Sequence, residues 1–375
     1  MINRSGDHSR AFRKINHIKP HIFHDGWLYC SKFDKILRTN DYGASFETVG
    51  QLDLQLPHAG IIRMSPLAQR LARAQVYRMR VLPSGNKVYV FRGGIYTQRV
   101  GEPTAQLSHA VQRGSRPVSL ANRASDLVVF GEYWSNAARE PVHIYGSEDG
   151  GLTWKVIYTF EAGAIRHVHG ITYDRFDDCF WICTGDYDDE CQLIRASRDF
   201  TDLQIVKQGG QGFRFFSTIV TEDVLLTATD SATDPNHICL YHKQTGRFER
   251  VAEIENTNFY LGLIGRQAFV STNAEPSEVH DQSASYVWTG SLDEGGWQHL
   301  FSFPVDLPYR LSRTRFVPNG LFQYSNVYFP EGDAPDDVLV CYGFGLSGFS
   351  DVMACYRSDQ WQAQSTSKSE FAGAK

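Results

Sequence analysis

The sequence predicts an all-β protein, a single β-propeller of seven blades with four antiparallel strands in each blade. A short turn motif recurs along the chain, and a unit of strand, acidic loop and strand recurs in phase with it. Helical patterning is nearly absent. The repeats are separated by multiples of about 50 residues, and a four-stranded propeller blade needs about 40–50 residues. These three observations together favour a propeller over other all-β folds.

The turn motif is clearest in SEDGGLTW, residues 147–154, between the strand-like runs PVHIYG and KVIYTF. Aspartate in such a turn accepts hydrogen bonds from the backbone, and glycine supplies the positive φ that the turn requires. Weaker copies are TNDYGASF at 39–46, SRDFTDL from Ser197 and SLDEGGW from Ser291. The aspartates of the four copies are Asp41, Asp149, Asp199 and Asp293. Their separations correspond to two, one and two units of about 50 residues.

This motif resembles the Asp-box, or BNR repeat, of the sialidase-like and other glycan-active propellers. The resemblance covers most of the chain as architecture, and it implies the fold and a carbohydrate ligand. VYRMRVLPSGNKVYVF also resembles the sialidase segment in which an arginine binds the substrate carboxylate, which implies that role for Arg78. Met79 and Arg80 stand where the family has a proline, and the sequence does not place the sialidase acid or nucleophile.

We expect the propeller to span residues 1–360, followed by a polar C-terminal tail at 361–375. The blades are predicted near 21–52, 76–113, 116–160, 165–206, 213–253, 258–303 and 321–360. A strand around Ala11 to Ile15 is expected to complete the last sheet. Residues 305–320 are expected to form an insertion or long loop, and SPLAQRLARAQV at 65–76 has helical spacing after a Ser-Pro start.

Composition and charge argue against a nucleic-acid-binding, membrane-spanning or secreted protein. The 375 residues carry a net charge of -5, without the concentrated basic face that nucleic-acid binding needs. No apolar run has the length of a membrane span, and the polar N-terminal segment lacks the apolar core of a signal peptide. The seven cysteines are odd in number and lack zinc-type spacing, which favours reduced, buried thiols in a cytoplasmic protein. A trimmed targeting segment is the alternative, and the oligomeric state stays open.

The candidate site follows from propeller geometry, which places the start of the first strand and the loop after the second strand of each blade on one face. Candidates for catalysis in these positions are His167, His169, Asp186, Glu190 and Asp230. Candidates for substrate binding are Tyr77, Arg78, Glu132, Tyr133, Arg166, Arg214 and Glu275. We expect the groups of the fourth and fifth blades to surround one cleft, side by side and partly open to solvent.

Each of these residues also has a structural interpretation. An arginine at a strand start can pair with an aspartate of the next blade, and an acidic loop can simply be solvated. The spacing of His167 and His169 puts both imidazoles on one strand face, where they can be buried and hydrogen-bonded. A metal role, completed by Asp186 or Glu190, is a third alternative. The expectation is a site without metal or other cofactor.

The sequence therefore predicts a protein that acts on a glycan, most simply an anionic one. A hydrolase would use two carboxylates from Asp186, Glu190, Asp230 or Glu132. A lyase would use His167 or His169 with a tyrosine, and an arginine would neutralise the carboxylate of a uronate. The alternative is a propeller that binds a glycan or a protein without catalysis.

Overall fold

The computed structural model describes residues 10–54, 59–275, 280–312, 322, 324–359 and 361. Within these residues the chain forms 29 strands and three α-helices, each of six residues. The protein is therefore all-β, as the sequence predicts. Two compact units divide the chain: one holds Met1–Cys30, Arg38–Glu47 and Ile254–Lys375, and the other holds Ser31–Leu37 and Thr48–Glu253.

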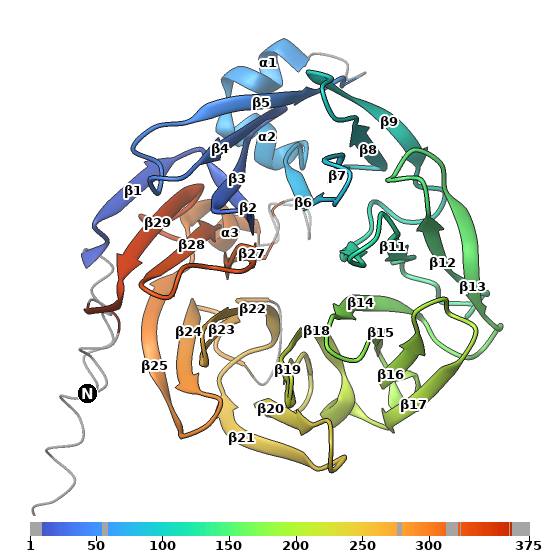
Figure 1. Cartoon of the computed structure of the whole chain (residues 1–375). Coiled ribbons are helices and arrows are strands. Elements are labelled where there is room, and N and C mark those ends of the chain that lie inside the picture. Colours follow the sequence, from blue (N-terminus) through green and yellow to red (C-terminus); the bar gives the residue numbers. More distant parts are fainter. Residues whose placement is uncertain are drawn as a thin grey trace, which may run out of the picture. The chain divides into compact units, whose positions relative to one another are not determined.

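The second unit contains four antiparallel groups of four strands, each group following the chain order (Figure 1). The first group is β6 (Val76–Val81), β7 (Lys87–Phe91), β8 (Gly94–Gln98) and β9 (Thr104–Ala110). The second is β10 (Ala121–Asn122), β11 (Val128–Gly131), β12 (Val142–Ser147) and β13 (Lys155–Phe160). The third is β14 (His167–Asp174), β15 (Cys179–Gly185), β16 (Gln192–Ser197) and β17 (Leu203–Gln208). The fourth is β18 (Phe215–Val220), β19 (Val224–Thr229), β20 (Asn236–His242) and β21 (Phe248–Ile254).

The first unit contains two four-stranded sheets. One is β22 (Asn258–Ile264), β23 (Gln267–Thr272), β24 (Ala284–Ser291) and β25 (Gly295–Pro304). The other joins β26 (Asn326–Tyr328), β28 (Val338–Phe344) and β29 (Val352–Arg357) to the N-terminal strand β1 (Arg13–Asn16). Strand β1 pairs antiparallel with β29, with Arg13 opposite Cys355. The expected completion of the last sheet by an N-terminal strand is confirmed.

One further meander has residues in both units. It consists of β2 (Lys19–His24), β3 (Trp27–Lys32), β4 (Lys35–Thr39) and β5 (Glu47–Leu52), hydrogen-bonded in that order. Strand β5 pairs in parallel with β9, and β2 pairs in parallel with the short strand β27 (Glu331–Gly332). The strand order of this sheet therefore continues from the meander into the group β6 to β9.

The helices differ from the sequence prediction in extent. Helix α2 (Pro66–Leu71) begins as expected, since Ser65 accepts a hydrogen bond from the amide of Ala68 at 3.2 Å. It ends five residues before 76, because Val76 already belongs to a buried strand. Helix α1 (Ala59–Met64) was not predicted, and α3 (Leu307–Ser312) replaces part of the loop expected at 305–320. Residues 313–320 of that stretch and 362–375 of the predicted tail lie outside the described residues. Within the described residues, no helix is long and apolar enough to cross a membrane.

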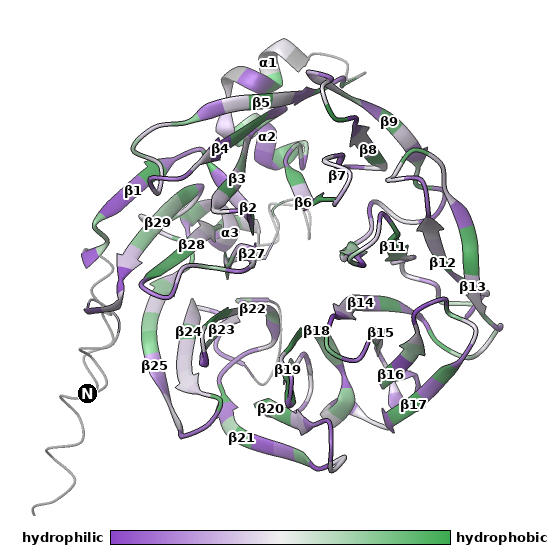
Figure 2. Ribbon diagram, viewed as in Figure 1, coloured by the Kyte–Doolittle hydropathy of each residue, from purple (hydrophilic) through white to green (hydrophobic). Residues whose placement is uncertain are grey.

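Hydrophobic side chains of the inner strands form the core. A cluster within β11 to β16 includes Val129, Val168, Phe180 and Ile194, all buried, and Figure 2 shows such hydrophobic stretches along the strands. All seven cysteines are free and buried. Burial raises the pKa of the Cys183 and Cys191 thiols to about 12, so these thiols are protonated and unreactive at neutral pH.

The turn between β12 and β13 is held by Asp149. The hydroxyl of Ser147 and the amides of Leu152 and Thr153 donate to Asp149 Oδ1 at 2.8, 3.1 and 2.9 Å, and the Thr153 hydroxyl donates to Oδ2 at 2.6 Å. Gly150 and Gly151 adopt φ of 76° and 87°, which glycine tolerates at no steric cost. Burial opposes ionisation of Asp149, but the hydrogen bonds outweigh it and lower the pKa of this carboxyl.

The other copies of the turn keep this network to different degrees. Asp41 accepts from the Thr39 hydroxyl at 2.7 Å and from the Ser45 amide at 3.0 Å, in the same pattern. Asp199 accepts from the hydroxyls of Ser197 and Thr201, both at 2.7 Å. In the fourth copy the carboxylate of Asp293 instead pairs with Arg266, with its closest oxygen at 2.6 Å. The hydrogen bonding to the aspartate therefore persists at Asp199 without the glycine, whereas Asp293 forms an ion pair with Arg266.

Replacing Trp154 with alanine is expected to lower the free energy of unfolding by about 3 kcal/mol. The indole packs on Phe130, with ring centroids 5.2 Å apart, and its N–H donates to the carbonyl of Gly151 at 3.1 Å. Trp154→Phe keeps most of the packing and should cost less than half as much. Urea denaturation of the three proteins measures the effect, and an unchanged midpoint for Trp154→Ala would show that this ring does not support the sheet.

Candidate functional site

Two neighbouring strands bring the densest polar cluster together. Strand β14 begins at His167, and the antiparallel strand β15 ends at Gly185, directly opposite His167. Asp186 follows Gly185, so the hairpin register alone places Asp186 beside the His-x-His segment. A Cβ on Gly185 would lie 2.6 Å from Cε1 of His169, so glycine makes room here for the second imidazole. The register shift between Val168 and Gly170 leaves His169 as the extra residue of a β-bulge, a feature that re-aims side chains.

The two imidazoles are oriented by backbone carbonyl groups. Nδ1 of His167 lies 2.7 Å from the carbonyl oxygen of Trp134, and Nδ1 of His169 lies 2.9 Å from that of Phe215. A carbonyl oxygen only accepts hydrogen bonds, so both Nδ1 atoms carry their protons. The Nε2 atoms of the two rings lie 2.9 Å apart. They lie 3.4 Å (His167) and 3.0 Å (His169) from Oδ1 of Asp186.

Asp186 also receives two guanidinium groups. Arg166 donates to Oδ2 at 2.8 Å, and Nη2 of Arg214 lies 3.1 Å from Oδ1. Burial opposes ionisation of this carboxyl, but its contacts with His167 and His169 and the charge of Arg214 outweigh it and lower the pKa of Asp186 well below its usual range. Asp186 is therefore an ionised carboxylate with several partners.

Burial also acts on the neighbouring titratable groups. It lowers the pKa of His169 to about 4, against the opposing hydrogen bond to Asp186, so this imidazole is neutral at pH 7. Burial and the charges of Asp230 and Asp186 raise the pKa of Tyr133 well above its usual value. The Tyr133 ring lies against His167, with centroids 4.2 Å apart. Tyr133 is thus a neutral phenol at the edge of the cluster.

The other predicted carboxylates are divided between this cluster and separate ion pairs. Asp230 joins the cluster, since its Oδ2 lies 3.5 Å from Nη2 of Arg214. Glu190 pairs with Arg139 instead. Glu132 pairs through both oxygens with Arg113 and accepts from the amide of His143 at 2.8 Å. Neither arginine partner was anticipated from the sequence, because nothing in a loop's composition reveals which distant side chain reaches it.

Three candidates lie elsewhere. Arg78 is 6% exposed and donates through Nε to the carbonyl of Val118 at 3.0 Å. Tyr77 lies beneath two guanidinium groups, with Arg116 4.1 Å and Arg78 5.3 Å from its ring centre. Glu275 belongs to the other compact unit. The structure therefore gathers His167, His169, Asp186, Arg166, Arg214, Asp230 and Tyr133 into one cluster.

The expectation that the site groups would be open to solvent is wrong for the imidazoles. His167 is 3% exposed and His169 is 1% exposed, because the carbonyls that orient them come from the neighbouring sheets β11 and β18 or their adjoining loops. The side chains of Arg166 and Arg214 are 20% and 18% exposed, so they are more open to solvent than the imidazoles. A large ligand can reach the arginines directly but not the histidines.

Tyr187 is a candidate binding residue that the sequence reasoning missed. It follows Asp186, and its ring is 53% exposed. The guanidinium groups of Arg166 and Arg139 lie 5.5 and 5.7 Å from the ring centre. The signal was an aromatic residue in the acidic loop GDYDDE. An exposed aromatic ring with two guanidinium groups near it suits a flat, anionic ligand.

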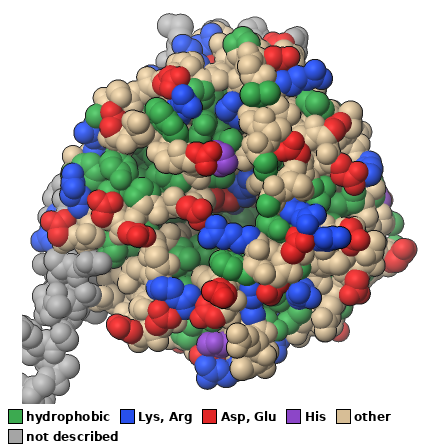
Figure 3. Space-filling view, viewed as in Figure 1, with side chains coloured by type: hydrophobic (Ala, Val, Ile, Leu, Met, Phe, Trp, Pro, Cys, Tyr) green, Lys and Arg blue, Asp and Glu red, His purple; other side chains and the backbone are tan. Residues whose placement is uncertain are grey.

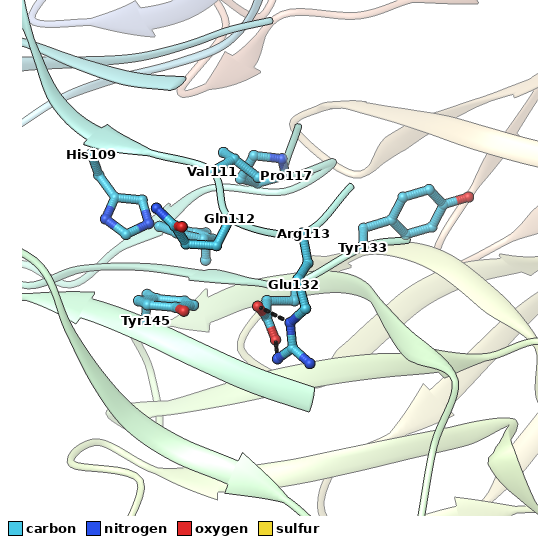
Figure 4. A pocket seen from close by; sticks show the side chains of 9 residues that line it. His109, Val111, Gln112, Arg113, Pro117, Glu132, Tyr133 and Tyr145 are labelled. Atoms are coloured by element: carbon cyan, nitrogen blue, oxygen red, sulfur yellow. Dashed lines mark hydrogen bonds and ion pairs between the residues drawn. The ribbon is translucent and has the colours of Figure 1, made fainter. Parts of the chain in front are cut away.

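A small pocket adjoins this cluster. Figure 4 shows its lining, with Arg113 and Glu132 joined and the rings of His109 and Tyr145 beside them. Those two rings have centroids 5.0 Å apart, and burial lowers the pKa of His109. Tyr133 also lines this pocket while its ring contacts His167. Tyr133 therefore belongs to both the pocket lining and the cluster, and Figure 4 shows its ring pointing away from the other lining side chains.

Two groups of described side chains present ligand atoms close enough together to hold a metal ion. One is His167, His169 and Asp186, and the other is Asp174, Asp177 and Cys179. In the second group the ammonium of Lys243 lies 2.9 Å from Asp174 and 3.2 Å from Asp177. A cationic side chain of the protein therefore already neutralises these carboxylates. The first group combines imidazole nitrogen and carboxylate oxygen, which suits first-row transition metals.

Comparison with known proteins supports the fold. No protein-family model matches the chain, and no curated protein matches its sequence. Among solved structures it is similar to AFV00434, an ancestral GH74 enzyme, with 12% identity and a TM-score of 0.52 over 91% of this chain and 46% of that one. The extracellular domain of the putative one component system BT4673 from B. thetaiotaomicron gives 11% identity and a TM-score of 0.54 over 91% of this chain and 38% of that one.

A chain of the Mitotic Checkpoint Complex gives 11% identity and a TM-score of 0.52, over 92% of this chain and 94% of that one. This chain spans less than half the length of the GH74 and BT4673 chains that it matches. At these identities the similarity concerns the fold alone. The consecutive four-stranded antiparallel sheets and these neighbours support a β-propeller.

Proposed function

We propose that this chain is a seven-bladed Asp-box propeller that binds an anionic glycan beside Tyr187. Seven groups of four strands can be counted when the meander β2 to β5 is taken as one blade and β1 is added to the last. The hydrogen-bonded turns at Asp41, Asp149 and Asp199 support the Asp-box assignment. The free, buried cysteines support a reducing compartment such as the cytoplasm.

The observation that carries the proposal is the exposed Tyr187 ring with the guanidinium groups of Arg139 and Arg166 near it. A sugar ring can stack on the tyrosine while its carboxylate or sulfate accepts hydrogen bonds from a guanidinium. Asp186 and Glu190 fix the two arginines, so little side-chain entropy is lost when the ligand binds. Figure 3 shows acidic and basic side chains interspersed on the face in view, which favours recognition of individual anionic groups over a general attraction for polyanions.

A second candidate function is cleavage of the same glycan. Two observations favour it: the His167, His169 and Asp186 cluster beneath the arginines, and the similarity of the fold to GH74 glycoside hydrolases. The burial of both imidazoles argues against direct proton transfer to a polymer by either one. The chain of the Mitotic Checkpoint Complex has a similar fold in an assembly, which leaves protein binding as the alternative to a glycan.

Tyr187→Ala is expected to weaken binding of an acidic oligosaccharide by about tenfold or more, equivalent to about 1.4 kcal/mol. Isothermal titration against uronic-acid oligosaccharides and their neutral counterparts measures the effect. Phe176→Ala is the matched control, since Phe176 is 44% exposed and has Arg175 at 5.2 Å from its ring, but lies in the β14–β15 turn. Equal losses in both variants, or binding of neutral and acidic sugars alike, would contradict the proposal. Assay of the same mixtures for new reducing ends and unsaturated products decides between binding and cleavage.

A further inference from the structure

We propose that His167, His169 and Asp186 form a binding site for a divalent first-row transition metal ion. The orientation of the two imidazoles and of the Asp186 carboxylate supports this site. Both Nδ1 atoms donate to backbone carbonyls, so Nε2 is the nitrogen that each ring can offer to a metal ion. Oδ1 of an ionised aspartate is an acceptor as well. Three acceptor atoms therefore converge on one buried point.

Such a convergence is costly unless a cation occupies it. Within the described residues, the two Nε2 atoms lie 2.9 Å from each other. Oδ1 of Asp186 lies 3.0 Å from Nε2 of His169 and 3.4 Å from Nε2 of His167. Buried acceptor atoms that face one another without a donor between them destabilise a protein. A metal ion would accept all three lone pairs at once.

The separations also match a coordination sphere. Ligand atoms about 2.1 Å from a shared ion are about 3.0 Å apart as cis ligands of an octahedron and about 3.4 Å apart in a tetrahedron. The three distances in the cluster, 2.9, 3.0 and 3.4 Å, fall in this range. Two imidazoles and one carboxylate on one face leave positions open for water or for an oxygen of a ligand.

The surroundings of the cluster have the form of a second coordination shell. Metal-bound histidines usually donate their other ring N–H to a carbonyl or carboxylate, as both do here. Arg166 holds Oδ2 of Asp186 at 2.8 Å and so turns Oδ1 toward the histidines. Arg214 approaches Oδ1 at 3.1 Å, and its charge is shared with Asp230 at 3.5 Å. This ligand set replaces the expectation, from the sequence, of a site without metal.

Titration of the chelator-treated, dialysed full-length protein with Co²⁺ tests the proposal at neutral pH. We expect one equivalent to bind, with visible absorption bands that report nitrogen and oxygen ligands. His169→Gln and Asp186→Asn should each weaken Co²⁺ binding at least tenfold. His143→Gln is the matched control. His143 also lies on a β-strand, and its Nδ1 forms a hydrogen bond with the Thr159 hydroxyl at 2.9 Å, but the residue is outside the cluster.

If His169→Gln fails to fold, X-ray absorption of the wild-type Co²⁺ complex still decides the question, since it must show two imidazole ligands. Absence of stoichiometric binding would overturn the proposal, as would binding that survives both cluster substitutions. The proposal does not depend on glycan binding, because metal content is measured without any sugar, and Tyr187→Ala should leave it unchanged.

Discussion

Replacing Asp186 with alanine should lower the free energy of unfolding by about 3–5 kcal/mol, the largest single effect expected near the site. The substitution leaves Arg166 and Arg214 beside two buried imidazoles without their shared anion. Removing one partner of a largely buried ion pair costs more than the pair contributes, and here two arginine side chains that are only 20% and 18% exposed lose the carboxylate they share. Chemical denaturation in the presence of a chelator measures this effect without any contribution from bound metal.

Asp178→Ala provides the control for that measurement. Asp178 also accepts two hydrogen bonds from an arginine, Arg123, both at 2.7 Å, but its side chain is 40% exposed. Solvent screens this pair, so its loss should cost about 0–1 kcal/mol. Comparable losses for Asp178→Ala and Asp186→Ala would mean that burial does not govern the energetics of the cluster.

Lys243→Ala is expected to cost about 3–5 kcal/mol as well. Lys243 follows β20 and extends to the β14–β15 turn, where its ammonium lies 2.9 Å from Oδ2 of the fully buried Asp174. Asp174 also accepts from the indole N–H of Trp181 at 3.0 Å and from two turn amides. Without the lysine this aspartate becomes a buried charge with neutral donors only.

Equilibrium unfolding in urea again provides the measurement. Lys155→Ala is the matched control, since Lys155 pairs with Glu148 at 3.2 Å while both side chains are more than 60% exposed. That substitution should change the unfolding free energy by less than about 1 kcal/mol. A cost below that value for Lys243→Ala would show that Lys243 does not tie the two sheets together.

The sequence predicted the strands well because their signals are local. Runs such as FWICTGD and VLLTATD are long enough and apolar enough to be buried strands, and they are β15 and β19. The pairing of His167 and His169 with Asp186 was also predictable, since a hairpin needs no information from distant residues. The short helices α1 and α3 were missed because six residues give too little periodicity to recognise.

The sequence could not predict the partners of the charged residues or the burial of the imidazoles. Glu190 pairs with Arg139, and Glu132 pairs with Arg113. The composition of the acidic loops does not reveal which arginine each carboxylate will contact. His167 is buried because the carbonyl of Trp134 lies over its ring nitrogen, which depends on how neighbouring sheets pack. Exposure of a site residue is thus a property of the assembled sheets, and a linear pattern of polar residues does not reveal it.

The pairing of β1 with β29 has a consequence for biosynthesis. Strand β1 (Arg13–Asn16) is made well before β29 (Val352–Arg357), so the sheet they share can form only after the long stretch of chain between them has been made. The meanders β6 to β9 and β14 to β17 contain only neighbouring segments and can fold as they emerge. At about 5–20 residues per second, β1 waits many seconds for its partner. Throughout that interval its backbone donors and acceptors are available to any other exposed strand edge, including one on a second nascent chain.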